Sequence, residues 1–170
     1  TPDHGWDLGF YDVTNPAEWM AGTDGGIWNP DVGIGYPNGS TPDGENAAYA
    51  ETNAGVDVGL SQVLEDTLRA NTQYDLSVQI GNPIYNESDT TADYRIELLA
   101  GGALLGSATG NSPTAGVWEA QTLTVTSSSN PAQLGQPLEI RLFAVEYVDE
   151  AGGGGYEVDF DEVVLTATPL

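Results

Sequence analysis

The chain has 170 residues, of which 39% are hydrophobic, enough for one domain with a sizeable core. It contains no cysteine, which excludes disulfide frameworks, thiolate metal sites and catalytic thiols. Its 26 acidic residues are opposed by only three arginines, and the formal net charge is −23. Nucleic acid and anionic membranes are therefore poor partners, because the chain cannot assemble a basic patch, whereas cations suit its surface. Membrane insertion is not expected, because no apolar run approaches the roughly 18 residues that a span requires.

The first 46 residues differ in amino-acid composition from the rest of the chain. They contain three of the four tryptophans, the only histidine and the only methionine, among many glycine, proline, asparagine and aspartate residues. We expect a first strand near residues 8–13, followed by a long loop rich in aromatic side chains. Such a loop is functional or disordered, and the aromatic content favours an ordered one.

From residue 47 onward the sequence alternates between apolar and polar residues, as half-buried antiparallel strands do. We predict strands at AAYAET (47–52), VDVGLSQVL (56–64), QYDLSVQIG (73–81), DYRIELLAG (93–101), VWEAQTLTV (117–125), PLEIRLFAV (137–145) and YEVDFDEVVLTAT (156–168). Only LSQVLEDTLRA (60–70) suggests a helix, and we expect at most one short helical turn there. About eight to ten strands separated by turn residues predict an all-β fold. We expect one antiparallel β-sandwich domain with jelly-roll topology over residues 1–170, with its main body at 47–170.

The last predicted strand carries an unusual group of four acidic residues within positions 157–162. A period of two places Asp159 and Asp161 on the face shared with Val163 and Leu165, so a carboxylate points toward the core unless a bulge intervenes. A buried carboxylate must be paired, protonated or bound to a cation. Calcium, which binds six to eight oxygen atoms, would neutralise such a pair. The alternative is an edge strand with solvated acids that discourage aggregation.

A second group of oxygen ligands lies in the stretch TPDGEN. Asp43 and Glu45 flank Gly44 and offer carboxylates to a cation from a tight turn. Pro-Asp-Gly is also an ordinary turn sequence, and the spacing does not match an EF-hand loop. Both readings stay open for this stretch.

Familiar catalytic motifs are missing from the sequence. His4 is the only histidine, and no Gly-x-Ser-x-Gly motif occurs, which argues against a Ser-His-Asp hydrolase. The GGGG run at 152–155 lacks the lysine of a phosphate-binding loop. Aromatic residues are the more informative set, because flat rings stack on sugars or line apolar pockets, although core packing is their commoner use. The candidate ligand-binding residues are Trp28, Tyr36, Tyr49, Tyr85 and Trp118.

Several long stretches, among them GIWNPDVGIGYPNGSTPDGENAAYAE, LSQVLEDTLRANTQYDLSVQIGN, LGQPLEIRLF and VDFDEVVLTATP, resemble a group of secreted bacterial proteins. That group has calcium-binding jelly rolls, commonly with a PEP-CTERM sorting tail, and is similar to carbohydrate-binding modules. The cyanobacterial Stig cyclases, which rearrange and cyclise indole alkaloid precursors, resemble an enzymatic branch of the same group. The resemblance covers roughly residues 26–169.

The resemblance implies a structural calcium ion where the last strand meets the first, with Asp161 and Asp159 as ligands. Tyr11 stands where the group usually has a glutamate, so Asp7 or Asp12 would have to supply the missing oxygen. The resemblance also implies export, to the cell surface or the extracellular space.

Taken together, these observations favour a non-catalytic extracellular module stabilised by calcium. We expect it to bind polysaccharide or to assemble with copies of itself, as a homo-oligomer or filament of a matrix. The alternative is an indole-alkaloid cyclase or isomerase like the Stig cyclases. Its buried general acid would be Asp161 or Asp159, because cyclases of that type place an aspartate on the last strand.

Overall fold

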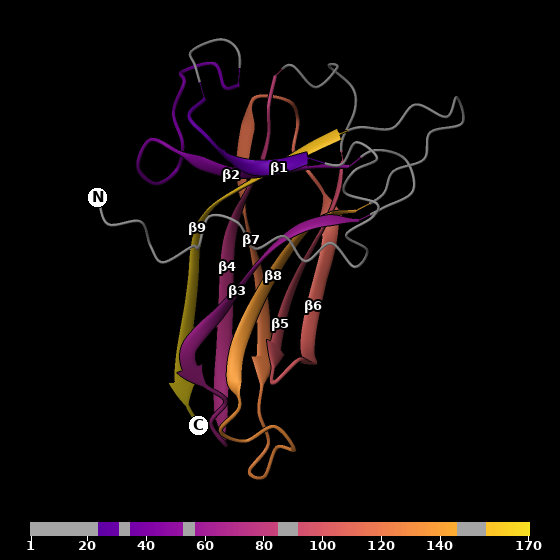
Figure 1. Ribbon diagram of the computed structural model, residues 1–170. Helices are drawn as coiled ribbons and strands as arrows, with labels where there is room; N and C mark the ends of the chain where they lie inside the picture. Colours follow the sequence, from indigo (N-terminus) through magenta and orange to yellow (C-terminus); the bar gives the residue numbers. More distant parts are fainter. Residues whose placement is uncertain (1–23, 31–34, 53–56, 85–91, 146–155) are drawn as a thin grey trace.

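The chain forms a sandwich of two antiparallel β-sheets (Figure 1). The computed structural model describes residues 24–30, 35–52, 57–84, 92–145 and 156–170. Its strands are β1 (Asp24–Trp28), β2 (Ala47–Thr52), β3 (Val58–Thr67), β4 (Thr72–Asn82), β5 (Asp93–Ala100), β6 (Ala103–Asn111), β7 (Val117–Thr126), β8 (Pro137–Val145) and β9 (Tyr156–Pro169). One sheet has the order β1-β2-β9-β4-β7 and the other the order β3-β8-β5-β6.

This architecture confirms the predicted all-β sandwich with jelly-roll topology. The described residues contain no helix, so the helical turn considered at 60–70 is absent there, and most of that stretch belongs to β3. Likewise, the described part of the chain has no helix long and apolar enough to cross a membrane. The strand expected at 8–13 lies outside the described residues.

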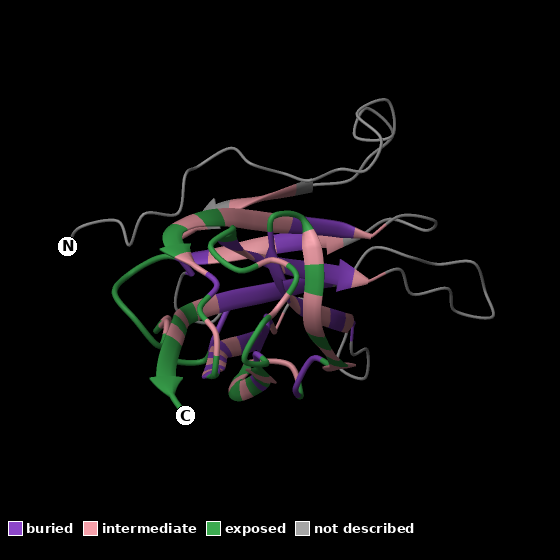
Figure 2. Cartoon of the chain, turned by 90° about the horizontal axis from the view of Figure 1, so that it is seen from below, coloured by how far each residue is buried: buried purple, intermediate pink, exposed green. Residues whose placement is uncertain are grey.

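The core lies between the two sheets and is filled by the inward side chains of both. Figure 2 marks the buried residues of the strands in purple. Strand β4 shows the cause most clearly, because its apolar residues alternate with polar ones and every second side chain is buried. Its buried positions 74, 76, 78 and 80 pack with Val158 and Phe160 of β9 and with Ile96, Leu98 and Leu142 of the opposite sheet. The C-terminal end of β9 is exposed.

Two strands did not follow from the apolar pattern. Strand β1, DGGIW, has two adjacent glycines, and β6, ALLGSATGN, consists mostly of small residues, so both sequences look like loops. Both lie at the edge of a sheet and pair with one neighbour only, β2 and β5 respectively. Backbone pairing, rather than side-chain alternation, therefore defines them.

A bulge in β9 changes which side chains face the core. The register against β4 shifts between Ser77 and Gln79, and Glu162 has a φ of 43°, in the left-handed region that non-glycine residues rarely adopt. Val163 and Leu165 pack against the core after the bulge. Before it, Asp159 and Asp161 alternate with the core residues Val158 and Phe160 and therefore lie on the outer face. The simple period-two placement of these acids with residues 163 and 165 was wrong for this reason.

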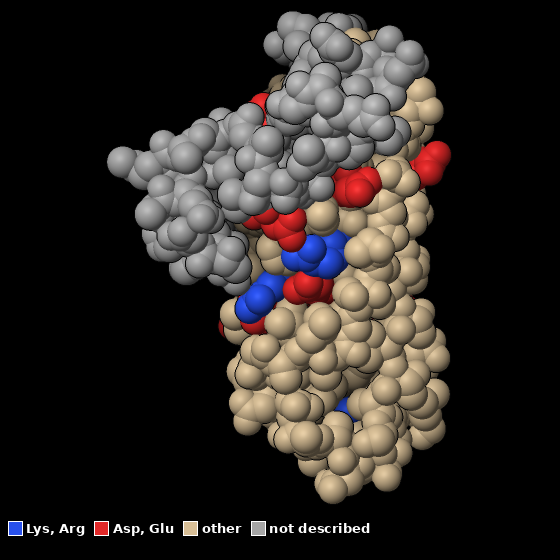
Figure 3. Space-filling view, turned by 90° about the vertical axis from the view of Figure 1, so that its right-hand side faces the viewer, with Lys and Arg blue, Asp and Glu red and all other residues tan. Residues whose placement is uncertain are grey.

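All three arginines are paired with nearby carboxylates. Arg95 contacts Asp57 and Glu97, each at 2.7 Å, and stacks over the Phe143 ring at 4.4 Å. Arg141 contacts Glu139, and Arg69 contacts Asp66 at the surface. Figure 3 shows acidic and basic side chains lying together on one face.

Candidate active site

The outer face of the five-stranded sheet has a single row of residues that crosses all its strands. Reading the register from β1 to β7, the row contains Gly26, Tyr49, Asp159, Gly81 and Trp118. Asp159 stands at the centre of the row, with Tyr49 next to it on one side and Gly81 on the other, and Trp118 follows beyond Gly81. Residues opposite each other on one face of a sheet are close enough to interact, so the side chains of this row can form one functional site.

Asp159 is the most buried charged residue described, with 0% of its surface exposed. Its Oδ2 accepts a hydrogen bond of 2.6 Å from the Tyr36 hydroxyl, and its Oδ1 accepts one of 3.2 Å from the Trp28 indole Nε1. Trp28 ends β1, and Tyr36 lies in the segment between β1 and β2. Two aromatic donors from the N-terminal part of the chain therefore hold an acid on the last strand.

The backbone of the segment that carries Tyr36 is tied to the sheet. Ile84 N, just after β4, donates to Gly35 O at 2.8 Å, and Gly39 N closes a turn onto Tyr36 O at 3.0 Å. The absence of side chains at Gly81 and Gly35 makes room for the aromatic rings. A Cβ at Gly81 would collide with the Tyr36 hydroxyl, and one at Gly35 would collide with the Trp28 ring.

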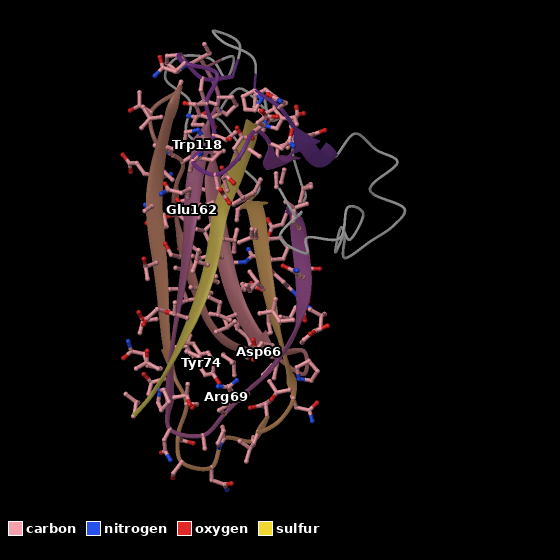
Figure 4. All side chains as sticks on the ribbon, turned by 90° about the vertical axis from the view of Figure 1, so that its left-hand side faces the viewer. Asp66, Arg69, Tyr74, Trp118 and Glu162 are labelled. Atoms are coloured by element: carbon pink, nitrogen blue, oxygen red, sulfur yellow. The ribbon has the colours of Figure 1, made fainter. Side chains whose placement is uncertain are left out.

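Tyr36 also stacks on Trp118, with ring centroids 4.6 Å apart and planes 23° from parallel. Such offset stacking is the favourable geometry for two aromatic rings. Trp118 lies on β7, and its indole Nε1 is the one buried side-chain nitrogen or oxygen of the described residues that has no hydrogen-bond partner. Figure 4 shows Trp118 and Glu162 toward one end of the sandwich, away from Asp66, Arg69 and Tyr74 near the other end.

The surroundings of Asp159 favour its protonated form. Burial is the main cause that raises the pKa of Asp159 well above its usual value, and the charge of Glu157 raises it further. A hydrogen bond with Glu157 acts in the same direction, whereas the bonds from Tyr36 and Trp28 lower the pKa. Glu157 lies two residues away on the same face and is itself 7% exposed. Burial and the second carboxylate outweigh the two hydrogen bonds, so the pKa of Asp159 is raised. Asp159 has no contact with solvent, and no arginine is paired with it.

Asp161 occupies a different environment on the same strand. Its Oδ2 accepts a 2.8 Å hydrogen bond from the backbone N of Asp43, and its Oδ1 accepts one of 2.8 Å from the N of Glu162. The pKa of Asp161 is raised, mainly by partial burial and also by the charges of Asp43 and Glu162, although the two backbone bonds lower it. Asp161 thus fastens the turn around Asp43 to the bulge of β9. Glu45, in the same turn, is exposed.

The structure therefore brings together part of the predicted set. Trp28, Tyr36 and Trp118 gather around Asp159, and Tyr49 lies opposite it. Three further candidates, Asp7, Asp12 and Tyr85, lie outside the described residues. Sequence reasoning missed Glu157 and Gly81 as parts of the site. The spacing of Glu157, two residues before Asp159, was the available signal for the first, and nothing in the sequence distinguished Gly81 from other glycines.

A neutral carboxylic acid held among aromatic rings can donate a proton, because its pKa lies closer to neutrality than that of a solvated aspartate. Aromatic walls suit a substrate that becomes cationic, since ring faces attract positive charge. A family model for the HpiC1-like cyclases matches residues 2–166. The chain belongs to the HpiC1-like cyclase family.

Solved structures of cyclases are similar to this chain over most of its length. A cyclase from Fischerella sp. TAU is 32% identical, with a TM-score of 0.73, and the match covers 86% of this chain and 75% of that one. A structure of the same organism's cyclase in complex with 4-(1H-indol-3-yl)butan-2-one is 31% identical, with a TM-score of 0.73 and coverage of 86% and 76%. A Stig cyclase from Fischerella sp. TAU, in complex with an indole derivative, is 31% identical with a TM-score of 0.71 over the same shares.

More distant structures share the fold alone. A carbohydrate-binding module in complex with β-1,4-galactotriose is 11% identical and has a TM-score of 0.59, covering 96% of this chain and 92% of that module. No curated protein sequence matches the chain significantly. The expected similarity to carbohydrate-binding modules is therefore confirmed at the level of fold, and the similarity to Stig cyclases at the level of family.

These findings correct the favoured functional prediction. The expectation of a non-catalytic module that binds polysaccharide or assembles into a matrix was wrong, because the family and its similar solved structures are cyclases, which are enzymes. The prediction of calcium as a cofactor was also wrong. The matched family is one of cyclases, and the described residues contain no group of three or more acidic or histidine side chains that could hold a metal.

Proposed function

We propose that this protein is a Stig-type cyclase that cyclises or isomerises an indole-bearing precursor, with Asp159 as its general acid. The observation that carries the proposal is the environment of Asp159. This carboxyl group is fully buried, held by two aromatic hydrogen-bond donors, and shifted toward its protonated form by burial and by Glu157. Of the two acids considered from the sequence, Asp159 fits the role better, because Asp161 accepts backbone hydrogen bonds in a turn.

The chemistry of such an acid is balanced without an oxidant, a reductant or a second substrate. The Asp159 hydroxyl donates its proton to an electron-rich carbon of the substrate and becomes a carboxylate. The resulting carbocation is attacked by another π bond of the same molecule, which forms the new ring. Loss of a proton from the cyclised cation returns the proton to Asp159, so the product is an isomer of the substrate.

The surrounding side chains would assist in defined ways. Trp118 and Trp28 offer ring faces that stabilise positive charge near the acid. Glu157 adds to the effect of burial in keeping Asp159 protonated in the resting state. The burial of Asp159 excludes water, which would otherwise capture the carbocation.

The substrate class is proposed from the similar proteins. Two of the similar Fischerella structures hold indole-containing molecules. An indole is planar and electron-rich, as a substrate for an aromatic-walled acid site should be. Export of this protein, expected from the sequence resemblance, stays a proposal of its own.

The proposal can be tested with purified protein and a panel of indoles that carry an alkene side chain. We expect at least one precursor to be converted to an isomer of equal mass and different chromatographic retention, which liquid chromatography with mass spectrometry detects. Glu45→Gln is a matched control that removes an exposed acid from the turn near Asp161 and should leave turnover unchanged. Failure of every indole to react or bind would reject the proposal.

A further inference from the structure

Asp159 is closed off from solvent, although a general acid must touch its substrate. Its exposed fraction is 0%, and each of its two carboxyl oxygens accepts a hydrogen bond from an aromatic side chain. A substrate atom can therefore reach the acid only where a covering side chain gives way, and the two aromatic donors are the candidates that contact the carboxyl oxygens directly. The question is which side chain moves.

Tyr36 has the arrangement that an aromatic substrate would need. Its ring stacks on Trp118 with a centroid separation of 4.6 Å, and its hydroxyl, at the far end of the ring, reaches Asp159 Oδ2 at 2.6 Å. Gly81 lies in the register between Asp159 and Trp118 and leaves room for the hydroxyl. A planar ring against Trp118 with its reacting edge at Asp159 would occupy the same volume.

Tyr36 is also better placed to move than Trp28. It belongs to the segment between β1 and β2, whereas Trp28 is part of β1, whose register with β2 runs from residue 24 to residue 28. The Tyr36 side chain is buried, with 2% of its surface exposed, but it is not a member of the hydrophobic cluster that joins the two sheets. Its ring can therefore leave without opening the core.

We propose that Tyr36 occupies the substrate position in the resting protein and that an aromatic substrate binds by displacing it. This inference rests on the proposed function for the class of substrate, a planar indole. The closed state has a cost for the ligand, because apparent affinity falls in proportion to the fraction of protein in which the position is empty. The same closed state keeps water from Asp159 until a ring replaces the Tyr36 ring.

Two variants show whether the ligand displaces the Tyr36 ring or whether Tyr36 stays in place and contacts the ligand. Tyr36→Ala removes the competing ring, while Tyr36→Phe keeps the ring and removes only the hydroxyl. With 4-(1H-indol-3-yl)butan-2-one as the probe in isothermal titration calorimetry, we expect Tyr36→Ala to bind roughly tenfold more tightly than wild type, from the loss of a competing stack and hydrogen bond. Tyr36→Phe should give a smaller gain. Weaker binding by Tyr36→Ala would overturn the proposal, because Tyr36 would then be a contact of the ligand.

A ligand-free measurement tests the closed geometry independently of the substrate class. Carboxyl groups are labelled with a carbodiimide and an amine, and the labelled positions are assigned by tandem mass spectrometry. We expect label on Asp159 in Tyr36→Ala but not in wild type, with the exposed Asp66 labelled equally in both as the internal control. Melting temperatures show whether both proteins are folded.

The two measurements distinguish the ways in which the account can fail. Label on Asp159 in Tyr36→Ala without binding of the indole by any variant supports the displacement of Tyr36 and rejects the indole class, and with it the proposed function. Equal protection of Asp159 in wild type and in folded Tyr36→Ala overturns the displacement of Tyr36, whatever the substrate is.

Discussion

Gly81 lies directly opposite Asp159 in the register of β4 and β9, and this pairing makes room at the acid. On the other side of Gly81 in the same row is Trp118, and the Tyr36 hydroxyl reaches over the glycine to Asp159. A side chain at position 81 would separate the acid from the aromatic stack. The contact between acid and rings therefore depends on one missing methyl group.

Replacement of Gly81 by alanine should disrupt that contact. The new Cβ would collide with the Tyr36 hydroxyl and lie 2.7 Å from the Trp118 ring, closer than real Cβ contacts. We expect a loss of about 1–3 kcal/mol in the free energy of unfolding, as is typical of overpacking. Tyr36→Phe lacks the colliding hydroxyl, so Gly81→Ala should cost less in that background. A double-mutant cycle by urea denaturation measures the difference, and additive effects would count against the collision.

Asparagine at position 159 should abolish turnover while the fold persists. Loss of a general acid typically costs about 10²- to 10⁴-fold in rate, and an amide cannot donate the required proton. The matched control is Asp161→Asn, which changes an acid two residues away in the same strand and should leave most of the activity. Initial rates on an accepted indole precursor, with melting temperatures for both variants, make the comparison. Equal losses in the two variants would mean that the strand, rather than Asp159, is what matters.

The pH dependence of activity should depend on Glu157. The active form of Asp159 is protonated, so kcat/KM should be maintained at low pH and fall as pH rises through the raised pKa of Asp159. Glu157→Gln removes the negative charge and the carboxylate acceptor that raise this pKa, though the larger effect of burial remains. The alkaline limb of the profile should therefore move to lower pH.

Glu51→Gln is the control for that shift. Glu51 lies opposite Glu157 on β2 but is not among the groups that shift the pKa of Asp159. The Glu51→Gln variant should therefore move the alkaline limb of the pH profile less than Glu157→Gln does. A limb that stays in place in Glu157→Gln, with only its height reduced, would give Glu157 a structural role alone.

The free energy of unfolding should also depend on pH through the titration of Asp159. The pKa of Asp159 is raised in the folded state above its unfolded value of about 3.9, so folding retains the proton. The stability that this group contributes is present below about pH 4 and is lost as pH rises through the folded pKa. Asp159→Asn removes this loss, so the variant should gain stability over wild type as pH increases in that window. Urea midpoints measured at several pH values test this, and parallel curves for the two proteins would contradict it.

The fold could be predicted from residues such as Leu76, Val78 and Ile80, whose alternation reflects burial of one face of a strand between two layers. Strands β1 and β6 could not, because their glycines and small residues carry no alternation and their pairing is decided by neighbours distant in sequence. The bulge at Glu162 was equally hidden. It depends on a left-handed backbone at a residue that gives no glycine-like signal, and it puts Val163 and Leu165 on the opposite face from Asp159.

The site was predictable in kind but not in arrangement. Trp28, Tyr36 and Trp118 stood out as aromatic residues in an acidic chain, and Asp159 as an acid on an apolar strand. Their meeting depends on a register that spans more than 120 residues of sequence, as the separation of Tyr36 and Asp159 illustrates. The acids were first assigned to calcium because the sequence does not reveal that the donors to Asp159 are a phenol and an indole.

The most direct test of acid catalysis by Asp159 is turnover in deuterated water, followed by mass spectrometry of the product. With an accepted indole precursor, the wild-type protein should yield a cyclised isomer that carries one deuterium at the protonated carbon, and Asp159→Asn should yield none. Product from wild type without deuterium, or equal deuterated product from both proteins, would contradict the account.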